Sequence, residues 1–162
     1  MFAAATLRSE ETFRITTFIS DNHVVVSFEL NDAYNDGVRE TIASGLRTTF
    51  TYQLELRTPG WIDRTVGTAV VSATDQYDNL NRRHTLTRTV DGRVEDALVT
   101  ENDAVVKAWL TKWSRVPIAD TARLDPARDY YVRVTTRARP TGGSLLGLTK
   151  TITGQVKFTF IP

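Results

Sequence analysis

The feature that most constrains the fold is an uninterrupted alternation of two kinds of residue between positions 46 and 57. One set is largely apolar, and its members are Leu46, Thr48, Phe50, Tyr52, Leu54 and Leu56. The intervening set is polar, and its members are Arg47, Thr49, Thr51, Gln53, Glu55 and Arg57. Because successive side chains of a strand point to opposite faces of a sheet, the pattern predicts a long strand with one buried and one hydrated face. Such a strand is typical of an antiparallel sheet, and Pro59 and Gly60 end it.

Weaker alternation predicts further strands along the chain. The segments are 13–19, 24–30, 66–74, 83–90, 130–135 and 156–160. Asp91 and Gly92 follow one of them directly and form a dipeptide that is typical of tight hairpin turns. The chain contains 25 threonines, more than any other residue type. This abundance fits the same interpretation, because β-branched side chains that tolerate water suit half-hydrated strands.

Two segments have helical spacing instead. After residues 31–32, Tyr34, Val38 and Ile42 recur every four positions, and Gly45 stands where a C-terminal cap is expected. The second helix is predicted between residues 100 and 117, from a start that resembles a capping box to a proline that stops it. Its apolar stripe consists of Val105, Val106, Trp109, Leu110 and Trp113.

The predicted order of elements is therefore ββαβββαββ. This order lacks the regular strand–helix alternation of a doubly wound parallel sheet. We expect a mainly β, α+β fold, namely an antiparallel sheet or β-sandwich of about seven strands with two packed helices. The length of 162 residues suits a single domain over 1–162, with a frayed N-terminus at 1–11 and a flexible glycine-rich loop at 140–150.

The composition restricts the classes of function. A net charge of +1 provides no electrostatic basis for nucleic-acid binding, so we expect no nucleic-acid partner. The absence of cysteine excludes disulfides, thiolate metal sites and thiol nucleophiles, and we expect no metal and no cofactor. No apolar run reaches the roughly 18 residues of a membrane-spanning helix.

Several pieces of the chain, taken in order, resemble a bacterial family catalogued as domain of unknown function 4390. The pieces are residues 42–56, Tyr77-Asp78-Asn79-Leu80, Pro117-Ile118-Ala119-Asp120 and Tyr130-Tyr131-Val132-Arg133-Val134. The similarity covers roughly residues 12–140, although His84 stands where we expect an aromatic residue and the glycine-rich segment after Arg139 differs. The resemblance implies an exported envelope protein without known catalytic residues or cofactor.

The N-terminal residues are relevant to the cellular compartment of the protein. Residues 1–6 have neither the basic region nor the apolar region of an intact signal peptide. Since the resemblance implies export, we expect a periplasmic or extracellular protein whose signal peptide is absent from this sequence. The alternative is the ordinary terminus of a cytosolic protein.

Two loops are candidate partner-binding sites. Leu145, Leu146 and Leu148 lie in the glycine-rich loop, and exposed leucines there would mark contact with a protein or lipid. The alternative is that they fold back and cap the core. Trp61 lies in the turn after the long strand, where an aromatic residue can anchor an interface or plug the open end of a sandwich.

Arg133, Arg137 and Arg139 occupy alternate positions of one predicted strand and so share a face. A stripe of guanidinium groups can bind an anion such as a phosphate or carboxylate. The alternative is cross-strand pairing with carboxylates such as Glu55 or Glu29.

Histidine chemistry is the remaining catalytic option. His84 lies close in sequence to Ser72, and Asp75 or Asp78 could orient its ring as in a hydrolase triad. The alternative is a surface histidine on a hairpin.

Taken together, the residue patterns and the family resemblance, which implies export to the envelope, predict a non-catalytic, exported binding or scaffold module of the bacterial cell envelope that contacts a protein or lipid partner through loops. The alternative is a carrier that holds a small apolar ligand between sheet and helices. A hydrolase that uses His84 is the remote alternative. The oligomeric state stays open.

Overall fold

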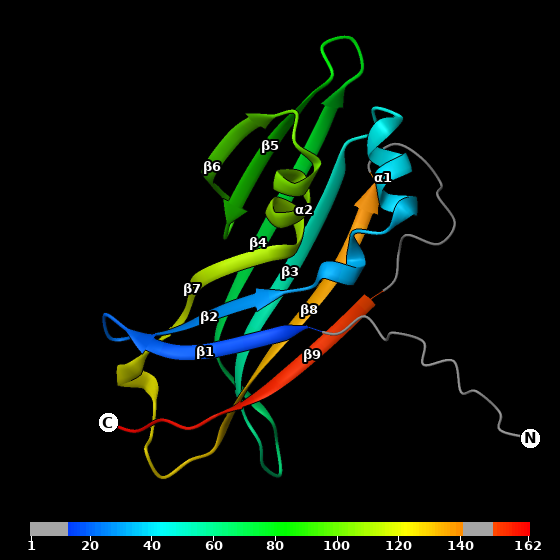
Figure 1. The fold of residues 1–162 in the computed structure, drawn as a ribbon. Helices are drawn as coiled ribbons and strands as arrows, with labels where there is room; N and C mark the ends of the chain where they lie inside the picture. The colour runs from blue at the N-terminus through cyan, green and yellow to red at the C-terminus, as the bar shows by residue number, and fades with distance from the viewer. Residues whose placement is uncertain (1–12, 141–150) are drawn as a thin grey trace, which may run out of the picture.

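The computed structural model describes residues 13–140 and 151–162, which form two antiparallel sheets and two α-helices (Figure 1). One sheet has the strand order β6-β5-β4-β3-β8-β9, with β3 (Thr48–Thr58), β4 (Arg64–Asp78), β5 (Arg83–Val90), β6 (Arg93–Thr100), β8 (Tyr130–Pro140) and β9 (Thr151–Phe158). The other has the order β1-β2-β7, with β1 (Arg14–Ser20), β2 (His23–Glu29) and β7 (Lys112–Asp120). The helices are α1 (Asp36–Ala43) and α2 (Asp103–Thr111), with short 3-10 helices at Asn31–Ala33 and Thr121–Arg123. The predicted fold class, mainly β with antiparallel sheets and two helices, is confirmed.

One face of the six-stranded sheet carries the core. In Figure 1, β1, β2 and β7 cross the lower half of this face, and the two helices lie against its upper half. The alternation in β3 has the predicted effect, because its inward side chains are all fully buried: Phe50, Tyr52, Leu54 and Leu56. The intervening side chains on the other face are only partly buried or exposed. Pairing of β3 with β4 and β8 places it at the centre of the sheet.

Two close contacts join the layers. The hydroxyl group of Tyr52 donates a hydrogen bond to the carbonyl oxygen of Leu110 at 2.5 Å, which ties α2 to β3. Gly67 on β4 lies against the backbone of Ile118 on β7, and a Cβ atom there would clash with the Ile118 carbonyl. Glycine is therefore required where the two sheets approach each other.

The structure has two strands that the sequence pattern did not predict, β6 and β7. β6 pairs only with β5, and all but its last residue are exposed, so it has no apolar alternation. β7 occupies residues that were assigned to the second helix, which ends at Thr111. Pro117 does not end a helix but lies within β7, an edge strand in which its missing N–H is tolerated.

The helix caps differ in detail from the prediction. Asn35 caps α1, and its side chain accepts a hydrogen bond from the backbone N–H of Val38. Asn102 caps α2 by accepting from Ala104 and Val105, in place of the expected capping box. Gly45 follows α1 with a φ of +85°, the left-handed conformation expected of a C-terminal cap.

Candidate functional site

Trp61 lies in the turn between β3 and β4, and Figure 1 shows this turn at the lower end of the molecule. Its side chain is entirely exposed, with 102% of the reference surface accessible, and the adjacent Ile62 is 72% exposed. The alternative in which Trp61 plugs an open end of the sandwich does not match this geometry. Two adjacent large apolar side chains in water make this turn a candidate contact site.

A polar network holds the base of this turn. The hydroxyl group of Tyr131 on β8 donates to Oδ2 of Asp63 at 2.8 Å and accepts from Nε of Arg57 at 3.1 Å. Arg57 also forms ion pairs with Glu55 at 3.2 Å and with Asp63 at 4.0 Å. These contacts join both ends of the turn to β8, so Trp61 projects from a fixed base.

A groove of about 630 Å³ lies next to the turn, between the end of β9 and the beginning of β8. Pro59 of the turn lines it, together with the apolar or aromatic side chains of Tyr130, Tyr131, Val156 and Phe158. Its volume falls within the range of small-molecule sites. We call residues 59–63 and this groove the Trp61 end.

Arg133 lies on the same sheet face as the network, opposite Glu55 in the register of β3 and β8. Its Nη1 atom lies 4.0 Å from Oε2 of Glu55, which is the cross-strand pairing considered as the alternative to anion binding. The side chains of Arg137 and Arg139 lie outside the described part of the structure. The anion-binding hypothesis for the three arginines therefore stays a prediction.

The leucine-bearing loop is the other predicted partner-binding site. Leu145, Leu146 and Leu148 lie outside the described residues, as does the rest of 141–150. The hypothesis that these leucines bind a partner stays a prediction.

His84 contacts a buried carboxylate on the inward face of the sheet. Its Nδ1 atom lies 2.7 Å from Oδ2 of Asp75, and its ring packs on Tyr77 with centroids 4.6 Å apart. Asp75 is completely buried, and burial raises the pKa of its carboxyl group despite the opposing effect of His84. Ser72 faces the other side of the sheet, where its hydroxyl lies 3.0 Å from that of Thr51. The structure therefore joins Asp75 and His84 but does not bring Ser72 to them.

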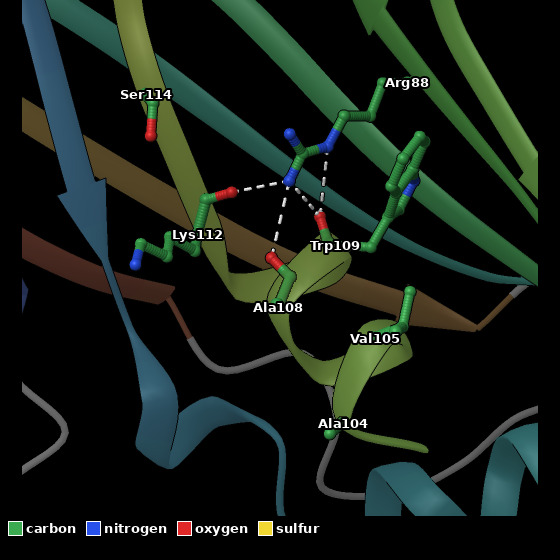
Figure 2. A pocket seen from close by; sticks show the side chains of 7 residues that line it. All are labelled: Arg88, Ala104, Val105, Ala108, Trp109, Lys112 and Ser114. Atoms are coloured by element: carbon green, nitrogen blue, oxygen red, sulfur yellow. Dashed lines mark hydrogen bonds between the residues drawn. The ribbon is translucent and has the colours of Figure 1, made fainter. Parts of the chain in front are cut away.

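A second hollow lies beside α2, and Arg88 of β5 forms one wall of it (Figure 2). The guanidinium group donates to the carbonyl oxygens of Trp109 at 2.7 Å and Lys112 at 2.5 Å, with a longer bond to that of Ala108. Its Cζ atom also lies over two indole rings, 4.7 Å from the centroid of Trp109 and 4.3 Å from that of Trp113. Burial lowers the pKa of Arg88. We call this region the Arg88 hollow.

Reasoning from the sequence missed Arg88. Its position in the alternation of β5 was the available signal, because Arg88 lies two residues after the fully buried Leu86 and so shares the inward face with it. A charged residue at an inward position of an alternating strand requires a partner, and no partner is adjacent in sequence.

Comparisons with known proteins give one positive result. A family model described as Domain of unknown function (DUF4390) matches residues 10–141. No curated protein and no solved structure gives a significant match to the chain. Within the described ranges, no three histidine, aspartate or glutamate side chains gather as a metal site would require, and no helix is long and apolar enough to cross a membrane.

Proposed function

The chain belongs to the DUF4390 family, a domain of unknown function, and from this premise we propose that it is a non-catalytic binding module that docks a protein partner at the Trp61 end. The observation that carries the proposal is the complete exposure of Trp61 at the tip of a braced turn. An aromatic side chain buries about 150–250 Å² in an interface, equivalent to roughly 4–6 kcal/mol of gross hydrophobic free energy. Tryptophan is also among the residues that dominate binding free energy at interfaces.

Bracing of the turn supports docking rather than chance exposure. Ordering a flexible loop on binding costs free energy, and a preformed loop avoids that cost. The bonds from Tyr131 to Asp63 and from Arg57 to Tyr131 fix the base of the turn in the free protein. The conformational entropy of the turn that presents Trp61 is thus already lost on folding and need not be lost on binding.

The groove beside the turn favours a protein over a lipid surface. A bilayer interface is flat and accepts projecting side chains, whereas a groove accepts a convex side chain from the partner. The groove is lined by Tyr131 and Phe158 and contains charged residues, Asp129 and Lys157. A mixed lining of this kind suits a peptide segment with both apolar and polar groups.

The packing of the core gives the carrier alternative no support. Such a carrier would place a cavity beside Phe50, Tyr52 and Trp109. Phe50 and Tyr52 are 0% exposed, and Phe50, Tyr52 and Phe28 pack against one another with ring centroids 4.8 to 6.5 Å apart. The described core is thus filled with side chains at Phe50 and Tyr52, whereas Trp109 lines the open Arg88 hollow at the surface.

The hydrolase alternative also lacks support from the described geometry. A triad requires a nucleophile within hydrogen-bond reach of the histidine. His84 has the carboxylate of Asp75, but Ser72 lies on the opposite sheet face. The His84–Asp75 contact is explained as the pairing of a buried carboxylate, which is costly to leave alone.

We also propose that the protein acts in the bacterial cell envelope, on its periplasmic or outer side. This location rests on the family resemblance. A fusion of the complete gene product to a reporter that is active only after export tests it.

Capture from envelope extracts tests the binding function. Wild-type protein, Trp61→Ala and Leu80→Ala are immobilised and compared. Leu80 is 94% exposed in the turn between β4 and β5, far from Trp61 along β4, and so serves as the matched control. We expect one protein to be retained by wild type and Leu80→Ala and to be lost, with affinity at least about 30-fold lower, in Trp61→Ala. Equal retention by all three proteins would contradict the proposal, and recovery of lipid alone would assign the site to a membrane surface.

A further inference from the structure

The Arg88 hollow contains a cation without a counter-ion. Among the described residues, no carboxylate oxygen lies within ion-pair distance of the Arg88 guanidinium. Asp96 stands opposite Arg88 in the β5–β6 register and attracts it only at longer range. The carbonyl groups and indole rings solvate the charge but do not neutralise it. A charge that is held partly out of water in this way attracts an anion.

One end of the guanidinium group remains available to a ligand. In Figure 2, the bonds to the carbonyl oxygens of Ala108, Trp109 and Lys112 all come from Nε and Nη2. Nη1 points away from these carbonyl groups and makes no hydrogen bond to another described residue. An Nη1 with two N–H donors can form charge-assisted hydrogen bonds to a carboxylate.

The rest of the hollow is mostly apolar. Ala104, Val105 and Ala108 form a low shelf along α2, and the two alanines are exposed because α2 presents them to solvent. Lys112 and Ser114, at the beginning of β7, line the other side and supply a second cation and a hydroxyl group. The hollow is open and has a volume of about 460 Å³, within the range of small-molecule sites.

From this arrangement we propose that the Arg88 hollow binds a single carboxylate group attached to an apolar body. The carboxylate contacts Nη1 of Arg88, and the apolar body lies on the alanine shelf. A group with several charges fits less well, because the carbonyl groups at the C-terminal end of α2 repel additional negative charge. A fatty acid and the C-terminal residue of an apolar peptide share this chemistry.

Calorimetric titration with defined probes tests the site. The probes are decanoate, N-acetyl-leucyl-leucine with a free carboxylate, and the uncharged decan-1-ol. We expect at least one carboxylate to bind at submillimolar concentration, at least tenfold more tightly than decan-1-ol. The carboxylate that binds more tightly identifies the source as lipid or peptide. Absence of binding by both carboxylates at millimolar concentration, or equal binding of decanoate and decan-1-ol, would overturn the proposal.

Variants locate the binding. Ala108→Phe fills the shelf and retains both the Arg88 side chain and the backbone carbonyl group at position 108 that Arg88 contacts, and we expect it to weaken carboxylate binding at least tenfold. Ala97→Phe, an equivalent enlargement of an exposed alanine on β6, is the matched control and should bind like wild type. Lys112→Glu should weaken binding severalfold. Wild-type affinity in Ala108→Phe, with the fold intact by circular dichroism, would show that the carboxylate binds elsewhere and would overturn the assignment.

Discussion

The two ends of the six-stranded sheet depart from the usual burial rules in opposite ways. At the Trp61 end, the apolar side chains of Trp61 and Ile62 are in water. In the other half of the sheet, the charged or polar groups of Asp75, His84 and Arg88 lie inside, under the helices. Exposed apolar side chains can be covered by a binding partner. Buried charged groups, in contrast, require hydrogen-bond or ion-pair partners within the protein. This difference agrees with the proposal that the Trp61 end binds a partner, and it shows that the inward polar groups of the helical half are held by contacts within the fold.

The largest expected effect is a difference in stability between variants of two tryptophans, one from each region. Trp113 is buried on β7 and covers the Arg88 guanidinium, so Trp113→Ala should lower the free energy of unfolding by about 3–5 kcal/mol. Trp61→Ala should lower it by less than about 0.5 kcal/mol, since Trp61 contacts solvent. Urea denaturation measures both. Similar losses of unfolding free energy in the two variants would contradict the contrast between the two regions.

Arg88→Gln tests whether the inward charge is structural. The shorter side chain cannot reach the carbonyl oxygens of Trp109 and Lys112, and the part-buried carbonyl group of Trp109 that loses its donor costs about 1–3 kcal/mol. We expect a loss of that size in denaturation, with the helical circular dichroism signal retained. No loss would show that the Arg88 hydrogen bonds do not contribute to holding α2, which its apolar face and the Tyr52–Leu110 hydrogen bond would then hold without them.

Asp75→Asn tests the buried carboxylate through its pH dependence. Because burial raises the pKa of Asp75, its protonated form is favoured in the folded state, so its contribution to stability is full below the unfolded pKa of about 3.9 and declines as pH rises through the folded pKa. The wild type should therefore lose stability relative to Asp75→Asn as pH rises from about 4, by about 1.4 kcal/mol for each unit of pKa elevation. Denaturation midpoints across this range measure the effect.

Asp78 supplies the control of opposite sign. Hydrogen bonds from Leu80 and Asn81 lower the pKa of its exposed carboxyl group. Its contribution is present above the unfolded pKa and is lost as pH falls through the folded pKa. Relative to Asp78→Asn, the wild type should thus gain stability as pH rises. Slopes of the same sign for the Asp75 and Asp78 variants would contradict this account.

A small expected change in stability concerns the braced turn. Tyr131→Phe removes the hydroxyl group that links Arg57 to Asp63 in a partly exposed network, so the free energy of unfolding should fall by less than about 1 kcal/mol. Partner affinity should nevertheless fall about 2- to 10-fold, because the turn must then be ordered on binding. Unchanged affinity would show that bracing is unimportant.

Local patterns in the sequence predicted the parts of the fold that depend on them. The alternation from 46 to 57 identified β3, and Asp91-Gly92 identified the turn after β5, where both residues have positive φ. β7 could not be predicted in this way. Trp109, Leu110 and Trp113 have helical spacing, and only pairing of Trp113 with Phe28 across β2 and β7 places Trp113 in a strand. β6 was missed because an exposed edge strand carries no apolar alternation.

The same distinction between local sequence patterns and long-range contacts applies to the candidate sites. The turn around Trp61 was predictable, because Pro59 and Gly60 end the strand and place Trp61 beyond it. The partners of Arg88 were not, because they are backbone carbonyl groups that come near only when α2 packs on β5. Backbone acceptors leave no signature in the sequence.

The most direct test of the central claim is site-specific photo-crosslinking in living bacteria that make the protein. Benzoylphenylalanine is introduced in place of Trp61 in one strain and in place of Leu80 in another, since both side chains project into solvent from turns. The account predicts one dominant protein adduct at position 61 that is absent at position 80. The same adducts at both positions, or no protein adduct at position 61, would contradict it.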